Sequence, residues 1–263
     1  MRALLTVDIC GRGKPLVLVH GLATNRSIWD LVAPRLAVTR QVVTLDLPGF
    51  GESAPAGPGY HLDRVADRIA RGLAARNVAG PFDLVGHSLG AGVATALAAH
   101  RPAAVRRLVL VAPAGFGAMP PRLSWLLGQG AVRLLALRRS LAPLADLEWG
   151  RRLLLAGAAA DGARIPPTMA RRMVAASASS TRTAEAMETI AQGQIGDLLR
   201  RVRAPLGLIW GTADRTVPGR HLDAVLRVRP DAGVELLDGA GHVPMIEQPE
   251  AFVAALERLL QAP

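Results

Sequence analysis

Cysteine, lysine and aromatic residues are scarce in this chain of 263 residues. The single cysteine, Cys10, excludes an intrachain disulfide. Aromatic residues make up 3% of the sequence, which argues against a surface on which nucleic-acid bases stack. No apolar run is long enough to cross a bilayer, and Asp8 interrupts the stretch where a signal peptide needs unbroken apolar residues. These absences predict a cytoplasmic protein without a membrane span.

The positive charge is carried almost entirely by arginine. The formal net charge is +10, yet only one of the 31 basic residues, Lys14, is lysine. Clustered basic residues can neutralise phosphates, but no basic run here exceeds two adjacent arginines. Abundant arginine and alanine are typical of GC-rich bacterial coding sequences. Composition bias therefore explains the charge, and we expect no nucleic-acid partner.

Short apolar runs alternate with helical patterns in the first half of the chain, and the alternation returns near its end. We expect strands at 15–20, 41–46, 82–87, 107–112, 205–210 and 234–237. Their nearly continuous apolar character is typical of strands covered on both faces. Helical spacing appears at 62–73, 91–99, 221–228 and 249–260. The pattern predicts an α/β fold with a mostly parallel central sheet and helices on both of its faces.

The stretch 115–196 has no strand pattern. It is rich in Leu, Ala and Arg at helical spacing, and prolines and glycines break it into segments. We expect an inserted helical subdomain of four helices here. The α/β core then comprises residues 1–114 and 197–263.

The strongest chemical signal is Gly86-His87-Ser88-Leu89-Gly90. This G-x-S-x-G pattern follows a predicted strand and precedes a helix of small residues, which is the context of a nucleophilic serine. In such a sharp turn the serine adopts a strained backbone conformation, and the glycines remove side chains that would collide. We predict that Ser88 is a catalytic nucleophile.

A serine hydroxyl needs a base to accept its proton and an acid to orient that base. Asp214 follows the predicted strand 205–210, and His242 lies in a glycine-rich loop after the last strand. In a parallel sheet, both positions fall at the edge where Ser88 lies. Asp214 and His242 are therefore the predicted acid and base.

The other five histidines are expected to play other parts. His61, His100 and His221 lie at predicted helix ends, so they are expected to be structural or solvated. His87 neighbours the nucleophile and cannot easily fold back onto it. His20 belongs to a glycine turn after the first buried strand.

Acyl transfer also needs backbone N–H groups directed at the oxygen that becomes negative in the transition state. The turn His20-Gly21-Leu22 and the start of the helix after Ser88 both offer such groups. We predict that the N–H groups of Leu22 and Leu89 form this oxyanion hole. The Leu89 group also lies at a helix N-terminus, where the dipole favours an anion.

The chain resembles the α/β-hydrolase superfamily over essentially its whole length. Five segments carry this resemblance in their order: Leu18-Val19-His20-Gly21, Asp46-Leu47-Pro48-Gly49-Phe50-Gly51-Glu52-Ser53, Gly86-His87-Ser88-Leu89-Gly90, Trp210-Gly211-Thr212-Ala213-Asp214 and Gly241-His242-Val243-Pro244. The resemblance implies that 115–196 is a lid over the active site and that 46–53 is mainly a structural loop. Two features depart from the usual pattern. The segment before Lys14 is short, so a strand is absent or shortened, and 112–117 lacks the acid found there in some relatives.

The serine at position 88 argues against the epoxide hydrolase and haloalkane dehalogenase branches, whose nucleophile is a carboxylate. We therefore expect hydrolysis of an ester, thioester or lactone through an acyl-serine intermediate, with no metal or organic cofactor. Leu, Ala and Met in the lid, with Trp125 and Trp149, predict an apolar pocket for a hydrophobic small molecule.

Several alternatives remain open at the level of sequence. The resemblance extends to carbon–carbon bond hydrolases of ring-cleavage dienoic acids, acyltransferases and cofactor-free haloperoxidase-like enzymes. The carbon–carbon hydrolases often have tryptophan after the catalytic histidine, where this chain has Val243. The ten arginines of 115–196 leave room for one that binds a substrate carboxylate, although an exposed lid surface explains them equally well. A ligand-binding receptor or scaffold that retains the fold is the non-enzyme alternative.

Overall fold

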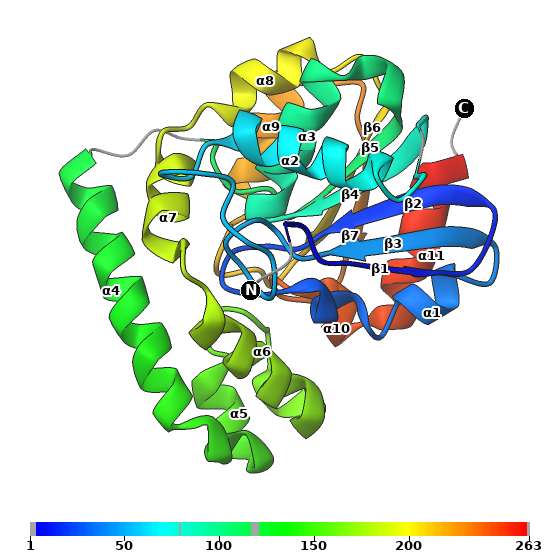
Figure 1. The fold of residues 1–263 in the computed structure, drawn as a ribbon. Coiled ribbons are helices and arrows are strands. Elements are labelled where there is room, and N and C mark those ends of the chain that lie inside the picture. The colour runs from blue at the N-terminus through cyan, green and yellow to red at the C-terminus, as the bar shows by residue number, and fades with distance from the viewer. Residues whose placement is uncertain (1–3, 79, 117–120, 262–263) are drawn as a thin grey trace.

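A computed structural model describes residues 4–78, 80–116 and 121–261. Seven strands form one sheet in the order β1-β3-β2-β4-β5-β6-β7 (Figure 1). Strand β1 pairs with β3 in antiparallel orientation, and the other neighbouring pairs are parallel. The strands are β1 (Val7–Cys10), β2 (Lys14–Val19), β3 (Arg40–Leu45), β4 (Phe82–His87), β5 (Val105–Val111), β6 (Leu206–Gly211) and β7 (Gly233–Leu237).

The predicted strands agree with the observed ones to within two residues at each end, and β4 has the predicted bounds. Continuous apolar sequence made them recognisable because both faces of the sheet are covered. The segment before Lys14 does contribute a strand, β1, but only four residues long. The expected α/β fold with a mostly parallel sheet is confirmed.

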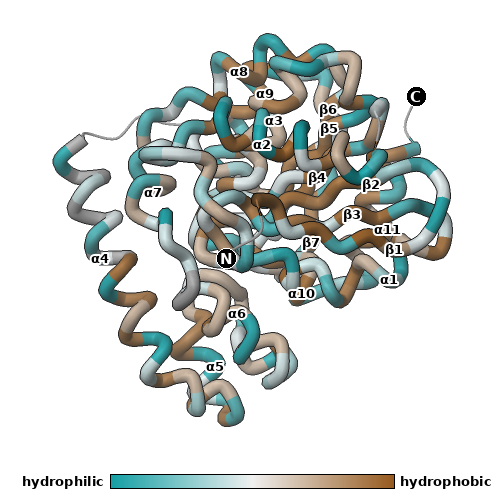
Figure 2. Tube along the Cα trace, viewed as in Figure 1, coloured by the Kyte–Doolittle hydropathy of each residue, from teal (hydrophilic) through white to brown (hydrophobic). Residues whose placement is uncertain are grey.

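Two hydrophobic cores lie on opposite faces of the sheet. Successive side chains of β2 alternate between them, with Val17 and Val19 in one core and Leu16 and Leu18 in the other. Figure 2 shows the hydrophobic residues concentrated in these central strands. Each fully buried Val or Leu stabilises the fold by about 1.5–3 kcal/mol. The two cores together hold the strand ends in fixed positions.

Helices cover both faces (Figure 1). One face packs against α2 (Leu62–Ala74), α3 (Leu89–His100), α8 (Ile195–Arg201) and α9 (Arg220–Val228). The other packs against the short turn η1 (Arg26–Trp29), α1 (Ala33–Leu36), α10 (Pro244–Glu247) and α11 (Pro249–Gln261). A further turn, η2 (Pro102–Ala104), precedes β5. Helix α2 is amphipathic because its buried residues are apolar and recur at helical spacing: Leu62, Val65, Ala66, Ile69 and Leu73.

Between β5 and β6 the chain forms a group of helices beside the sheet (Figure 1). They are α4 (Pro121–Ser140), η3 (Ala142–Asp146), α5 (Glu148–Leu154), η4 (Gly162–Arg164), α6 (Pro167–Ser179) and α7 (Thr183–Ala191). The chain enters this insert from the carboxyl end of β5. Two backbone hydrogen bonds tie it to the core, from Thr181 N–H to Gly49 O at 3.0 Å and from His242 N–H to Ala158 O at 3.1 Å.

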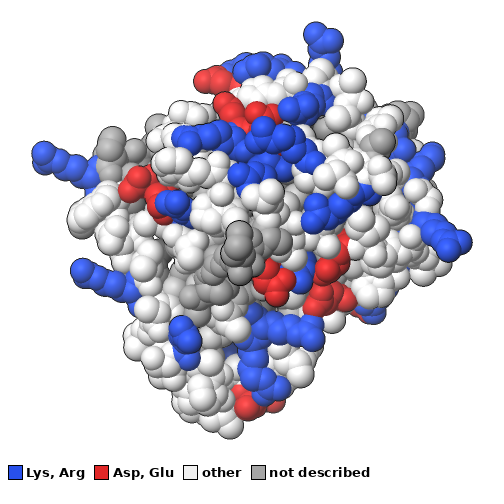
Figure 3. Space-filling view, in the orientation of Figure 1, with Lys and Arg blue, Asp and Glu red and all other residues white. Residues whose placement is uncertain are grey.

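Charged side chains are dispersed over the surface. Figure 3 shows Lys and Arg across the visible face, with Asp and Glu interspersed among them. Many arginines form ion pairs with exposed acids, as Arg101 does with Asp67, and Arg40 and Arg106 pair with the buried Asp83. No helix within the described ranges combines the length and the hydropathy needed to cross a membrane.

Candidate active site

Ser88 occupies the turn between β4 and α3. Its backbone has φ 52° and ψ −115°, a conformation that residues other than glycine rarely adopt. The turn is held by a 2.9 Å hydrogen bond from Ser88 N–H to Val111 O. The strained turn predicted from the sequence is therefore present, and such strain persists only where the surrounding structure enforces it.

The two glycines of the pattern allow the close packing around this turn. A Cβ atom on Gly90 would lie 2.3 Å from the carbonyl oxygen of His20, and one on Gly86 would lie 2.5 Å from that of Gly90. Both contacts are with backbone, which cannot move aside as a flexible side chain can. The pattern G-x-S-x-G is thus a steric requirement of this turn.

Asp214 and His242 lie in direct contact. The Nδ1–H group of His242 donates to Asp214 Oδ2 at 2.8 Å, and both residues are buried. The other carboxylate oxygen, Oδ1, accepts the N–H groups of Thr216 at 2.8 Å and Val217 at 2.9 Å. These bonds hold the carboxylate, and the carboxylate in turn selects the tautomer of His242 whose Nε2 can accept a proton.

Ser88 and His242 line the same cavity, of about 510 Å³. Within the part of the chain that the structure describes, the Ser88 hydroxyl has no hydrogen-bond partner. Nucleophile and base are often poorly aligned before substrate binds, so this geometry is compatible with the predicted roles. The structure thus brings the three predicted residues to one edge of the sheet.

Glu247 supports the loop that carries His242. Its Oε1 accepts the N–H groups of Gly241 at 2.9 Å and Val243 at 3.3 Å, and its Oε2 accepts that of Ala160 at 2.8 Å. Burial raises the pKa of the Glu247 carboxyl, while these three backbone hydrogen bonds oppose the increase. The side chain connects the His242 loop to the insert, a role that the sequence did not indicate.

His87 also contacts the His242 loop. Its Nε2–H group donates to the His242 carbonyl oxygen at 2.8 Å, and the two ring centroids are 4.8 Å apart. Burial, followed by the proximity of His242, lowers the pKa of His87 well below its ordinary value. His87 is therefore neutral at physiological pH, which leaves its Nε2–H group as the donor.

The turn after β2 lies against Ser88. A Cβ atom on Gly21 would lie 2.7 Å from His87 Nδ1 and 3.1 Å from Ser88 Cβ. His20 fixes this turn, because its Nδ1–H group donates to Gly21 O and its Nε2 accepts the N–H group of Leu47, both at 2.8 Å. Burial lowers the pKa of His20 to about 4, so it remains neutral.

The two N–H groups predicted to form the oxyanion hole belong to Leu22, which lines the cavity, and to Leu89, the first residue of α3. Among the residues described, neither group has a hydrogen-bond acceptor. Leu89 itself is buried and is not part of the described cavity lining, so the oxyanion hole stays a prediction.

The core and the insert share the walls of the cavity. Its apolar lining includes Leu22, Ala114, Ala156, Ala158, Met173, Met187, Ile190, Ala191, Val217 and Val243. Several polar residues at its wall, among them Arg138, Arg220 and His221, were not predicted site residues. His221 was expected to be structural or solvated. No local pattern distinguishes these residues, because they come from separate segments of the chain that meet at the cavity only in the folded protein.

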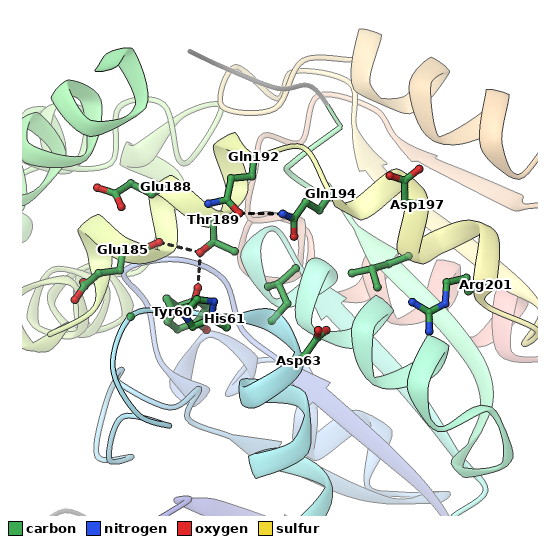
Figure 4. A pocket seen from close by; sticks show the side chains of 13 residues that line it. Tyr60, His61, Asp63, Glu185, Glu188, Thr189, Gln192, Gln194, Asp197 and Arg201 are labelled. Atoms are coloured by element: carbon green, nitrogen blue, oxygen red, sulfur yellow. Dashed lines mark hydrogen bonds between the residues drawn. The ribbon is translucent and has the colours of Figure 1, made fainter. Parts of the chain in front are cut away.

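A second cavity, of about 550 Å³, lies between the start of α2 and the helices α7 and α8 (Figure 4). Four carboxylates line it: Asp63, Glu185, Glu188 and Asp197. Its described lining contains none of Ser88, Asp214 and His242. In the described ranges, no group of three or more His, Cys, Asp or Glu residues is arranged to hold a metal ion. The cavity at Ser88 is therefore the better candidate for an active site.

The sequence pattern of the alpha/beta hydrolase family matches residues 16–255. The chain belongs to the α/β-hydrolase family. It is 30% identical over 254 residues to the pimeloyl-[acyl-carrier protein] methyl ester esterase of Neisseria meningitidis, an alignment that covers 92% of this chain and 91% of that protein.

Solved structures of α/β-hydrolases share the fold. The enol-lactonase of Burkholderia xenovorans LB400 is similar with a TM-score of 0.75 and 21% identity, covering 97% of this chain and 96% of that one. A thermophilic esterase from Thermogutta terrifontis is similar with a TM-score of 0.73 and 23% identity, covering 98% and 93%. At these identities the likeness establishes the fold, and the activity must be argued from the site.

Proposed function

We propose that this α/β-hydrolase is a serine hydrolase that cleaves an ester, thioester or lactone of a hydrophobic small molecule. The observation that carries the proposal is the buried 2.8 Å contact between His242 and Asp214, with His242 lining the same cavity as Ser88. A nucleophile, an oriented base and an acid then lie at one sheet edge, as acyl transfer requires. The esterase and lactonase names of the similar proteins support the same reaction class.

In the first step, Ser88 Oγ attacks the substrate carbonyl while His242 Nε2 accepts its proton. Asp214 remains ionised and stabilises the imidazolium that forms. The carbon–oxygen or carbon–sulfur bond then breaks, and His242 gives the proton to the departing alcohol or thiol. Water attacks the acyl-serine with His242 again acting as base, which releases the acid and restores Ser88.

The N–H groups of Leu22 and Leu89 are proposed to bind the oxyanion of both tetrahedral intermediates. Leu89 adds the favourable dipole of the α3 N-terminus, since it is the first residue of that helix. Loss of one oxyanion donor lowers the rate by about 100 to 1,000-fold in comparable sites. His20 supports this arrangement by fixing the turn that carries Leu22.

We further propose that residues 115–196 act as a lid that determines substrate choice. Met173, Met187 and Ile190 of the insert line the cavity beside Ser88, which favours an apolar substrate portion. The backbone bond from His242 N–H to Ala158 O joins the lid to the loop of the proposed base.

A fluorophosphonate probe and a series of p-nitrophenyl esters, from acetate to octanoate, test the proposal. We expect wild-type protein to be labelled and to hydrolyse the medium-chain esters, and Ser88→Ala to lose both activities. Ser140→Ala, which removes an exposed hydroxyl at the end of α4, is the matched control. Undiminished turnover by a folded Ser88→Ala variant would refute the mechanism. A folded wild type that is neither labelled nor active would favour the receptor or scaffold alternative.

A further inference from the structure

Two arginines line the proposed catalytic cavity, and its described lining contains no carboxylate. Arg138 reaches it from α4 of the insert, and Arg220 from the start of α9 in the core. The cavity is therefore apolar over much of its wall and positively charged at one part of it.

The two arginines belong to the same junction between insert and core. Arg138 Nη2 lies 3.5 Å from the carbonyl oxygen of Ala156, and the next residue, Gly157, accepts a hydrogen bond from Thr216 Oγ1. Thr216 is four residues before Arg220 and also lines the cavity. Arg138, which is half-buried, and Arg220, which is exposed, thus both line the cavity and belong to segments that meet where the insert joins the core.

Many arginines of the molecule form ion pairs with carboxylates, whereas others, such as Arg107 and Arg215, have no such pair among the described residues. The ion-paired set includes Arg26, Arg40, Arg106, Arg152, Arg171, Arg172, Arg182, Arg229 and Arg258. In the described part of the structure, Arg138 and Arg220 have no such partner. Arg138 has only its long contact with Ala156 O, which is too weak to compensate for burial.

Arg138 is half-buried, and burial alone lowers its pKa from the ordinary value. Partial burial of a cation without an anionic partner destabilises a protein. We therefore expect Arg138 to pair with an anionic group that a ligand supplies. At the same junction, the buried Nδ1 of His221 has no hydrogen-bond partner among the described residues. The positive charge of Arg138 and the hydrogen-bonding capacity of His221 Nδ1 are therefore both unsatisfied by the described residues.

Arginines without an acid also line a cavity beside α2, which includes Arg68, Arg71 and Arg76, so what sets Arg138 and Arg220 apart is that they share a cavity with Ser88 and His242. The second cavity, in Figure 4, is lined by four carboxylates and only one arginine, Arg201. Carboxylates therefore do line cavities of this arginine-rich protein, but they are missing from the cavity that contains Ser88 and His242.

We propose that the substrate carries a carboxylate group that binds Arg138 and Arg220 while its ester, thioester or lactone bond lies at Ser88. The inference rests on the proposed hydrolase function and narrows its substrate class to monoanionic acyl compounds with an apolar middle portion. A planar guanidinium group suits a carboxylate because it can donate two parallel hydrogen bonds to it. The apolar lining then contacts the chain between the two functional groups.

The test compares two p-nitrophenyl esters of equal acyl length, mono-p-nitrophenyl adipate and p-nitrophenyl hexanoate. We expect the wild type to favour the adipate ester in kcat/KM. The preference ratio should fall by about tenfold or more in Arg138→Gln and again in the double variant with Arg220→Gln, because each loses a charged hydrogen-bond donor. Arg139→Gln is the matched control, since Arg139 is exposed on the same helix and is not part of the described cavity lining.

A binding measurement separates this inference from the proposed reaction. Calorimetric titration of the Ser88→Ala protein with each ester reports affinity without turnover, and the adipate ester should bind more tightly only while Arg138 is present. Hydrolysis of the hexanoate ester with no adipate preference in either assay would overturn the carboxylate site and leave the hydrolase proposal intact. Adipate-selective, Arg138-dependent binding by a protein inactive on every ester would support the site and refute the hydrolase proposal.

Discussion

The side chain of His87 donates a 2.8 Å hydrogen bond to the main-chain carbonyl of His242, and their rings lie 4.8 Å apart. The residue before the proposed nucleophile therefore contacts the loop of the proposed base. Because His87 is neutral and buried, this contact positions His242 without placing a positive charge beside it at physiological pH. The turn of Ser88 and the loop of His242 are thus linked through one side chain.

Removing the His87 donor is expected to lower kcat. His87→Phe keeps an aromatic ring beside His242 but loses the hydrogen bond, which in a neutral pair contributes about 1 kcal/mol and corresponds to roughly fivefold in rate. His87→Gln, which retains an N–H donor, should recover part of this loss. Ester hydrolysis and thermal unfolding of both variants provide the measurement. Equal kcat values in the two variants would show that the hydrogen bond has no positioning role.

Glu247 is expected to stabilise both the fold and the geometry of His242. Glu247→Gln replaces one acceptor oxygen by an NH₂ group that faces backbone N–H donors, so we expect a loss of about 2 kcal/mol in the free energy of unfolding and a severalfold decrease in kcat. Urea denaturation and ester kinetics measure the two effects. The control is Glu250→Gln, which alters only an exposed ion pair with Arg35 and should change stability by less than about 1 kcal/mol. If Glu250→Gln lost as much stability and kcat as Glu247→Gln, the role of Glu247 in holding the His242 loop would be contradicted.

Asp214→Asn is expected to leave the fold intact and to lower kcat by about 10⁴-fold, the effect of the corresponding change in a serine protease. An amide at this position no longer enforces the His242 tautomer that donates from Nδ1. Asp238→Asn, at an exposed carboxylate after the neighbouring strand, is the control. Initial-rate kinetics with circular dichroism distinguish lost catalysis from unfolding, and a loss below tenfold would remove Asp214 from the proposed mechanism.

Acid is expected to destabilise the protein through His20. Its pKa is about 4 in the folded state and 6.5 when unperturbed, so the unfolded chain binds more protons between these values. The contribution of neutral His20 is complete above pH 6.5 and decreases as pH falls toward 4, by about 3 kcal/mol in total. Urea denaturation at intervals from pH 7.5 to 4.5 measures this slope, which should be smaller in His20→Gln than in the exposed control His61→Gln. Identical slopes of unfolding free energy against pH in the two variants would exclude His20 as the source of the acid sensitivity.

Local sequence determined most of the fold and the turn of Ser88. The strand at 82–87 was predicted with its observed bounds because strands covered on both faces need continuous apolar residues, and β4 is buried throughout. The glycines around Ser88 were recognisable because the packing of Gly86 and Gly90 against backbone leaves no room for a Cβ atom. The proximity of Asp214 to His242 could be inferred as well, since both follow strands of one parallel sheet.

Tertiary structure alone decided the contacts around these residues. His87 and His242 are 155 positions apart, and Glu247 and Ala160 are 87 apart, so no local pattern relates them. Arg138 lies in an arginine-rich helix whose sequence does not distinguish it from Arg139, yet only Arg138 appears in the described lining of the cavity. The physical reason is that strands and turns are specified by neighbouring residues, whereas the cavity wall depends on how the insert packs against the core.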